Sequence, residues 1–208
     1  MPTLLFEIGC EELPASACRE AEAQLTAVGL GEVFAGPRRL AVLGEVPERS
    51  PDEWIKGPPE HLRDKAAEGF ARKHGVGVDA LEVRDGFLGV TVPGGPIAES
   101  LPRRLDEILR ALAFSKTMRW DESGLRFPRP VRWLCAKLDG ETLEGFGGFS
   151  YGHRFAAGQV EIPHAEEYLD TLRAAGVEPS AGERRRLTTR NERLGPDVHM
   201  REVVTSGG

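Results

Sequence analysis

The chain has 208 residues, of which 40% are hydrophobic and 29% are charged, and its formal net charge is −6 at pH 7. This length is enough to bury a real core, as one large domain or two small ones, and the composition fits neither a disordered nor a membrane protein. No apolar run approaches the ~20 residues that a membrane-spanning helix needs, and the acidic balance argues against non-specific DNA coating.

The cysteines indicate the compartment. Cys10, Cys18 and Cys135 are odd in number and scattered along the chain. This usage fits a reducing environment, so we expect a cytoplasmic protein without disulfides. The three residues form no CxxC pair and no histidine is close to them in sequence, so we expect no metal site. The amino terminus has no basic region and its apolar run is broken at Glu7, so we expect no signal peptide.

The first part of the chain predicts strands around one helix. Residues 3–9 are almost all apolar, which is typical of a central strand, and apolar residues at helical spacing predict a helix over 15–28. Short β-like runs follow at 33–34 and 39–46. Residues 47–59 are rich in proline and charge, which favours a loop or a hinge.

The later elements are predicted in the same way. Residues 61–74 and 97–112 have helical spacing, and between them two β-like runs are joined by Asp85-Gly86, a strong hairpin signal. A strand is predicted at 131–138, and a short one at 160–162. Two helices then follow, from Pro163 to Ala175 and over the very basic residues 180–193.

Strands, hairpins and helices in irregular order predict an α+β fold, with mixed or antiparallel sheets packed against several helices. We expect an α+β domain over residues 1–163, with a hinge at 47–59. Residues 164–208 are expected to form a helical extension, and the unstructured ending VVTSGG suggests a truncated chain.

Residues 116–133, KTMRWDESGLRFPRPVRW, contain five cations, and the two opposing carboxylates leave a local net charge of +3 (five minus two). Two interpretations are open. The cations and rings form a surface that binds phosphates and stacks on bases, or the tryptophans are core and the arginines form a solvated rim. The cations are Lys116, Arg119, Arg126, Arg129 and Arg132.

A second basic group consists of Arg38, Arg39 and Arg154. Arg38 and Arg39 directly follow the turn at Gly36-Pro37. Such a pair can bind a phosphate bidentately, or can pair with the acidic residues near the end of the first strand. Both possibilities are open on the sequence.

Glu11, Glu12 and His153 are candidate acid–base groups. The two glutamates are expected near the positive start of the first helix, where helix electrostatics or a contact with another subunit explains them without catalysis. Catalysis needs a shifted pKa and a partner nucleophile or metal, and the sequence shows no such partner. For a lone histidine, a hydrogen-bonded strand position is the more ordinary role. Phosphate-loop, dinucleotide, zinc-protease and GxSxG signatures are all absent from the sequence.

Five motifs in order, FEIGCEELP, GPRRLAV, KTMRW, LRFPRPVRWL and GHRF, resemble the N-terminal part of the β subunit of bacterial heterotetrameric (α2β2) glycyl-tRNA synthetases. The resemblance runs from about Leu4 to the ERRR segment. It implies an assembly that joins glycine to tRNA using ATP. In that family the α subunit holds the active site, with ATP and Mg²⁺, and the β subunit contributes tRNA binding and is needed for activity.

Family members continue through a helical region resembling HD phosphohydrolases and an anticodon-binding domain, and the present sequence ends before both. The resemblance therefore implies a portion without catalytic residues or a cofactor of its own, with the α subunit and tRNA(Gly) as partners and no role for DNA or a membrane. From charge we expect RNA contacts from Lys116, Arg119, Arg126, Arg129 and Arg132, and then from Arg38, Arg39 and Arg154.

Two alternatives remain open. One is a stand-alone hydrolase of a nucleotide or a mischarged tRNA that uses Glu11, Glu12 and His153. The other is a pure assembly module that contacts only other synthetase subunits. A closed pocket that joins the three residues would favour the hydrolase, an open basic face would favour RNA, and a flat apolar patch would favour assembly.

Overall fold

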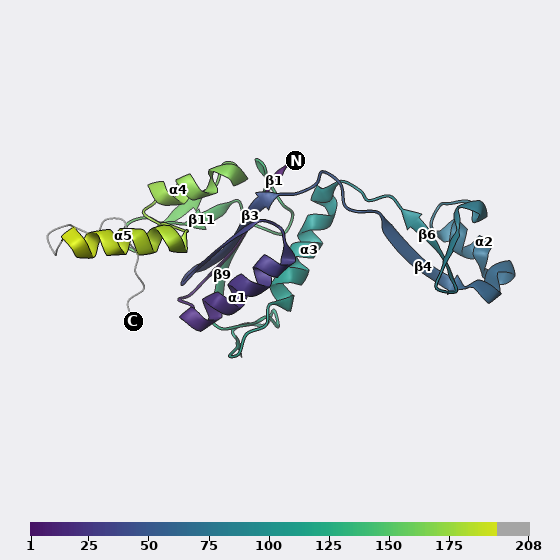
Figure 1. The fold of residues 1–208 in the computed structure, drawn as a ribbon, viewed down its shortest axis with the longest axis horizontal. Coiled ribbons are helices and arrows are strands. Elements are labelled where there is room, and N and C mark those ends of the chain that lie inside the picture. Colours follow the sequence, from purple (N-terminus) through teal and green to yellow (C-terminus); the bar gives the residue numbers. More distant parts are fainter. Residues whose placement is uncertain (195–208) are drawn as a thin grey trace. The chain divides into compact units, whose positions relative to one another are not determined.

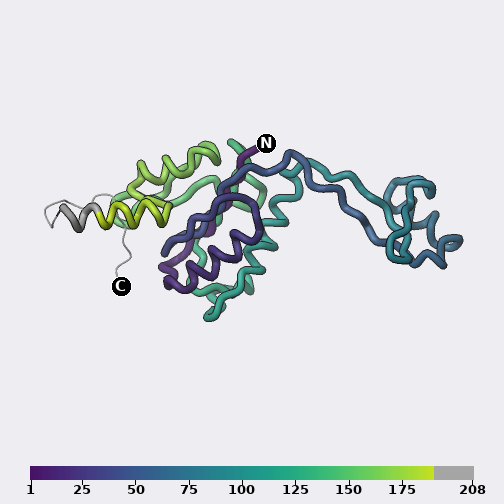
Figure 2. Tube along the Cα trace, in the orientation of Figure 1, coloured from purple at the N-terminus to yellow at the C-terminus, as the bar shows by residue number. Residues whose placement is uncertain are grey.

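The computed structural model describes residues 1–194 (Figures 1 and 2). The fold is α+β, as expected, with helices packed against small antiparallel sheets. The described chain divides into two compact units, a small one formed by Glu48–Ser100 and a large one formed by Met1–Pro47 together with residues 101–194. The expected domains were 1–163 and 164–208. Residues 48–100 have a core of their own and residues 165–172 pack into the core of the large unit, while residues 195–208 of the expected helical extension lie outside the described residues.

The large unit is built on a five-stranded antiparallel sheet in the order β10-β9-β1-β3-β2. Its strands are β1 (Thr3–Cys10), β2 (Glu32–Gly36), β3 (Arg39–Glu45), β9 (Val131–Leu138) and β10 (Glu141–Thr142). The central strand β1 pairs with β3 on one side and with β9 on the other. From Leu4 to Cys10 it is buried on both faces, which explains why its sequence is nearly all apolar instead of alternating.

Both faces of this sheet are covered. On one face Leu5 and Trp133 pack with Tyr168 and Leu172, which come from the 3₁₀ turn η3 (Ala165–Glu167) and helix α4 (Tyr168–Ala174) that follow β12. Side chains of successive strand residues point to opposite faces, so Leu4, Phe6 and Ile8 are buried on the other face.

Helix α1 (Ala15–Val28) has the predicted bounds and packs against β2 and β3. Its buried residues, Ala17, Ala21 and Leu25, recur every fourth position and form one apolar stripe. Helix α3 (Ile97–Ala111) also confirms its prediction and contains Pro102. The remaining elements of the large unit are β7 (Met118–Arg119), β8 (Arg126–Phe127), β11 (Phe149–Tyr151), β12 (Gln159–Glu161) and the basic helix α5 (Ala181–Leu194).

The small unit is a three-stranded antiparallel sheet, β4-β6-β5, packed against one helix. Its turn at Asp85-Gly86 has φ angles of 51° and 76°, so the predicted hairpin is confirmed with the left-handed backbone of a tight two-residue turn. Its elements are β4 (Glu53–Pro59), η1 (Glu60–Leu62), α2 (Arg63–Lys73), η2 (Val78–Ala80), β5 (Glu82–Arg84) and β6 (Phe87–Val92).

The expected loop or hinge at 47–59 is wrong for residues 53–59, which form strand β4. The prolines mislead because β4 lies at an edge of its sheet, where proline is tolerated. Ile55 packs against the core of the unit, and the Trp54 ring lies over Gly89, so the segment has packing reasons to be a strand. Within residues 1–194, no helix is both long enough and apolar enough to cross a membrane.

The three cysteines are free thiols, and they differ in burial, which predicts different rates of alkylation. Burial raises the pKa of Cys10 and of Cys135 to about 12, and it also raises the pKa of the half-buried Cys18 thiol. At pH 8 the two buried thiols then carry roughly a thousandfold less thiolate than a thiol of pKa 9. In timed alkylation followed by mass spectrometry, we expect Cys18 to react first and the other two only in denaturant. Modification of native Cys10 as fast as Cys18 would contradict this.

Candidate nucleic-acid interface

The basic stretch 116–133 forms a hairpin followed by strand β9. Met118 pairs with Phe127, and Arg119 pairs with Arg126. Phe127 anchors the hairpin because it is buried and its ring meets that of Phe114 edge-to-face, with centroids 4.9 Å apart. The indole Nε1 of Trp120 donates a hydrogen bond to the Phe127 carbonyl at 2.8 Å, which ties the loop to the strand.

Three cations of this hairpin face solvent. Lys116, Arg119 and Arg126 are exposed, and within residues 1–194 no carboxylate forms an ion pair with any of them. We call these three residues, with the partly exposed Trp120, the basic hairpin. Arg119 and Arg126 lie directly opposite each other, and like charges in a cross-strand pair destabilise a sheet. An anion bound between them would offset that repulsion.

Arg129 and Arg132 are also exposed, but they lie against the two glutamates that follow β1. Arg132 Nε is 2.8 Å from Glu11 Oε1, and Arg129 Nε donates to the Glu12 carbonyl at 3.2 Å. Arg154, which follows β11, forms an ion pair with the Glu12 carboxylate. Glu11 and Glu12 are therefore matched by arginines from two distant segments, in an exposed cluster whose pairs each stabilise the fold only slightly.

Arg39 has a different position from its neighbour Arg38. Its side chain is buried, where Nη1 donates to Ser150 Oγ at 3.1 Å and lies 3.8 Å from the Glu7 carboxylate. Nη2 donates to the Tyr151 carbonyl. The physical reason is that Arg39 points to the face of the sheet that Tyr168 and Leu172 cover, so its guanidinium is enclosed by the protein, and we leave Arg39 out of the proposed RNA contacts.

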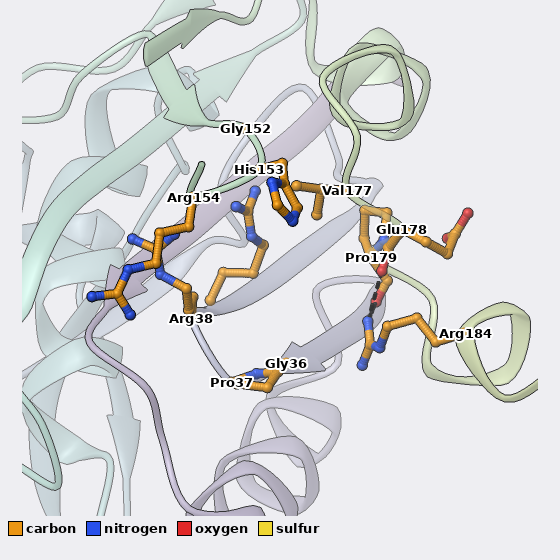
Figure 3. Close-up of a pocket in the computed structure, with 11 residues that line it drawn as sticks. Gly36, Pro37, Arg38, Gly152, His153, Arg154, Val177, Glu178, Pro179 and Arg184 are labelled. Carbon is orange, nitrogen blue, oxygen red and sulfur yellow. Dashed lines mark hydrogen bonds between the residues drawn. The ribbon is translucent and has the colours of Figure 1, made fainter. Parts of the chain in front are cut away.

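Arg38 lines a cavity of about 60 Å³ (Figure 3). The cavity lies where three segments of the large unit converge: the β2–β3 turn, the loop after β11, and the α4–α5 connection with the start of α5. Sequence reasoning selected Arg38 and Arg154 here but missed Arg184, although the basic run 183–186 pointed to that helix. The lining residues are Gly36, Pro37, Arg38, Arg39, Gly152, His153, Arg154, Val177, Glu178, Pro179 and Arg184.

His153 lines this cavity, whereas Glu11 and Glu12 do not. Its backbone N–H donates to the Ala175 carbonyl, and its Nδ1 accepts a hydrogen bond from the Phe155 N–H at 3.3 Å. A catalytic base is normally oriented by a carboxylate or a similar group, and here the ring is oriented by its own loop. In the part of the chain that the structure describes, no group of three or more His, Cys, Asp or Glu residues is arranged to hold a metal ion.

The two tryptophans of the basic stretch have different roles, one as a core residue and the other as part of an exposed surface. Trp133 is buried and its Nε1 donates to the Glu7 carboxylate at 2.7 Å, as expected of a core residue. Trp120 directly follows Arg119 and is 38% exposed, as expected of a binding surface. The stretch 116–133 therefore combines a buried tryptophan on β9 with an exposed cationic and aromatic face on the hairpin.

Comparison with known proteins shows the family to which the chain is similar. The model of the family described as "Glycyl-tRNA synthetase beta subunit" matches residues 4–194. The glycine–tRNA ligase beta subunit of Thermotoga sp. (strain RQ2) is 37% identical over 217 residues, which cover 90% of this chain and 32% of that protein. The corresponding protein of Picosynechococcus sp. (strain ATCC 27264 / PCC 7002 / PR-6) is 41% identical over 217 residues, 86% of this chain and 30% of the relative. The chain thus spans about a third of the length of these curated relatives.

Proposed function

Because the chain belongs to the glycyl-tRNA synthetase beta subunit family, we propose that it is the amino-terminal portion of a glycine–tRNA ligase β subunit that binds tRNA(Gly). In this proposal an α subunit carries out the ATP- and Mg²⁺-dependent glycylation in the cytoplasm. The present chain supplies binding energy and no catalytic group.

The observation that carries the proposal is the basic hairpin. Lys116, Arg119 and Arg126 are exposed, and within residues 1–194 none of them is paired with a carboxylate, although the chain as a whole is acidic. The direct opposition of Arg119 and Arg126 costs stability in the free protein, and this cost is relieved when a phosphate approaches both guanidinium groups. A polyanion is the ligand that this arrangement favours.

The mechanism that follows is positioning. Contacts to the phosphate backbone fix the orientation of a nucleic acid and carry little sequence information. Held in this way, the tRNA would present its 3′ end to the active site of the α subunit. The energy of binding the tRNA is thereby used to orient its 3′ end for the reaction. Specificity for tRNA(Gly) then requires base contacts from elsewhere in the assembly.

The proposal is tested by replacing Arg126 with alanine in the full-length protein. Loss of one phosphate contact is expected to weaken tRNA binding roughly tenfold at low salt and to reduce the slope of log K against log[salt] by about one. Filter binding across a salt series measures both quantities. In the complex with the α subunit, kcat/KM for tRNA should fall by about the same factor, because this ratio reports the binding energy lost from the transition state.

Arg103→Ala is the matched control, since Arg103 is an exposed arginine of the same unit that pairs with Glu107 on helix α3. It should leave both affinity and salt slope unchanged. If stably folded Arg126→Ala and Arg119→Ala proteins bind tRNA as tightly as the wild type with the same salt slope, the basic hairpin is not the RNA-binding surface.

A further inference from the structure

The cavity lined by Arg38 is richer in cations than in anions. Its lining includes Arg38, Arg39, Arg154 and Arg184, and Glu178 is the only carboxylate among the residues of 1–194 that line it. Figure 3 shows Arg38 and Arg154 on one side of the cavity and Arg184 on the other, next to Glu178 and Pro179. A volume of about 60 Å³ gives room for a group of a few heavy atoms.

Most of the charges around the cavity are already matched. Glu178 accepts from Arg173 Nε at 2.9 Å and from the Ser180 N–H, and Arg154 pairs with Glu12. Two arginines are left over: within residues 1–194, neither Arg38 nor Arg184 forms an ion pair with a carboxylate.

The Nε of Arg38 is buried, and no atom of residues 1–194 forms a hydrogen bond with it. Burying an unpaired polar group of a charged side chain is costly, so this atom marks a place where a partner is missing from the free protein. An anion in the cavity would supply an acceptor.

Arg184 is held rigidly at the other side. Its guanidinium donates to the carbonyls of Glu178, Pro179 and Ala35 at 2.8, 2.6 and 3.0 Å, so its position is fixed from two segments before any ligand arrives. Burial lowers the pKa of Arg184, the nearby Glu178 carboxylate opposes this shift, and the charges of Arg39 and Arg185 act with burial. A bound anion would compensate a guanidinium that has lost its hydration.

An exposed aromatic ring lies next to this cavity. Phe155 is 88% exposed, and its ring centroid lies 5.6 Å from Arg154 Cζ and 6.1 Å from the centroid of the His153 ring. Both of those residues line the cavity. Large aromatic side chains are seldom left this open, and an exposed ring beside cations is the usual platform on which unpaired bases stack.

We propose that the cavity and Phe155 together bind one unpaired nucleotide of an RNA, with its phosphate between Arg38 and Arg184 and its base on the Phe155 ring. This inference rests on the proposed RNA-binding function and adds a second site, separate from the basic hairpin. A base inside a duplex cannot reach the ring without unstacking, so the site selects single-stranded RNA, such as an end or a loop.

The test compares a short single-stranded RNA with a blunt duplex of the same sequence, each bound to the full-length protein and followed by fluorescence anisotropy. Phe155→Ala should weaken single-strand binding about tenfold, as expected for loss of one stacked base, and should leave duplex binding unchanged. Phe155→Tyr keeps the ring and should restore binding. Arg38→Gln should weaken single-strand binding and reduce its salt slope by about 0.7. Leu62→Ala, which truncates an exposed apolar residue of the small unit, is the matched control.

The outcomes separate this site from the basic hairpin. If Arg126→Ala weakens tRNA binding but Phe155→Ala and Arg38→Gln leave single-strand binding intact, the nucleotide site is rejected and the proposed function stands. If Phe155→Ala and Arg38→Gln weaken single-strand binding but Arg126→Ala leaves tRNA binding intact, the nucleotide site stands and the hairpin is rejected as an RNA-binding surface. If Phe155→Ala disrupts association with another subunit and leaves RNA binding unchanged, the face binds protein and the inference is overturned. If no RNA binds to the wild type, both proposals are overturned.

Discussion

Replacing Glu7 with alanine is expected to lower the free energy of unfolding of the large unit by about 3–5 kcal/mol. Glu7 lies in the middle of the central strand and is fully buried. Its carboxylate accepts hydrogen bonds from Trp133 Nε1 and from Ser150 Oγ, both at 2.7 Å, and lies 3.8 Å from Arg39. The alanine would leave the Arg39 charge, the indole N–H and the Ser150 hydroxyl without this acceptor, and each loss adds to the cost.

Urea unfolding, with amide hydrogen exchange of β1 as a probe of the large unit alone, measures this loss. Glu45→Ala is the matched control, because Glu45 is an exposed glutamate of the same sheet, and it should change stability by less than about 0.5 kcal/mol. Glu7→Gln should cost less than Glu7→Ala, since the amide keeps the shape and an acceptor. A Glu7→Ala protein as stable as the wild type would show that the buried network contributes nothing to the fold.

Tyr168 borders the same network. It is fully buried, and burial, followed by the Glu7 carboxylate, raises the pKa of its hydroxyl well above the ordinary value. Within residues 1–194 the hydroxyl has no hydrogen-bond partner. The network is thus satisfied around Glu7 by Trp133, Ser150 and Arg39, and not by the tyrosine.

The polar core also connects to the surface. Arg39 donates to Ser150 Oγ and to the Tyr151 carbonyl, so it fixes the end of β11. The chain then continues directly into the loop that contains His153, Arg154 and Phe155. A buried ion pair therefore holds in place the segment on which the proposed nucleotide site depends, which gives Arg39 a structural role close to, but outside, the proposed RNA contacts.

Periodicity was sufficient to predict most elements of the fold. The apolar run of β1, the stripe of α1 and the Asp85-Gly86 turn are local signals, and the structure confirms each of them. The family resemblance is confirmed as well. Local signals could not predict that residues 48–100 form a separate unit, because that depends on contacts between Met1–Pro47 and the chain after Leu101.

The sequence predicts which charged residues belong to the candidate site, but not where each of them lies in the fold. Arg38 and Arg39 look equivalent in the sequence, yet one lines a cavity and the other is buried against Glu7. The difference arises because Arg38 is the last residue of a turn and Arg39 the first residue of β3. Likewise, the hydrogen-bond donors to the Glu7 carboxylate, Trp133 and Ser150, lie more than a hundred residues away, and no short-range pattern connects them to Glu7.

Gly9→Ala is expected to destabilise the large unit by about 3–5 kcal/mol, although it adds a single methyl group. Gly9 pairs with Trp133 across the sheet, and the indole lies directly over it, so that a Cβ at this position would overlap the ring. The backbone of β1 cannot move away from the ring because β1 is hydrogen-bonded to β3 on one side and to β9 on the other. The ring must shift instead, which adds the strain of overpacking to the loss of its hydrogen bond to Glu7.

Gly158→Ala separates this effect from a general cost of losing glycine, because a Cβ there meets open space and stability should stay within about 0.5 kcal/mol of the wild type. A second arm combines Gly9→Ala with Trp133→Leu. If the methyl group acts by displacing the indole, the double variant should be clearly more stable than the sum of the two single losses predicts, since the smaller side chain no longer meets it. Additive losses would mean that Gly9 is required for a reason unrelated to Trp133, and the stacking of the ring on β1 would then not explain why the strand carries glycine at this position.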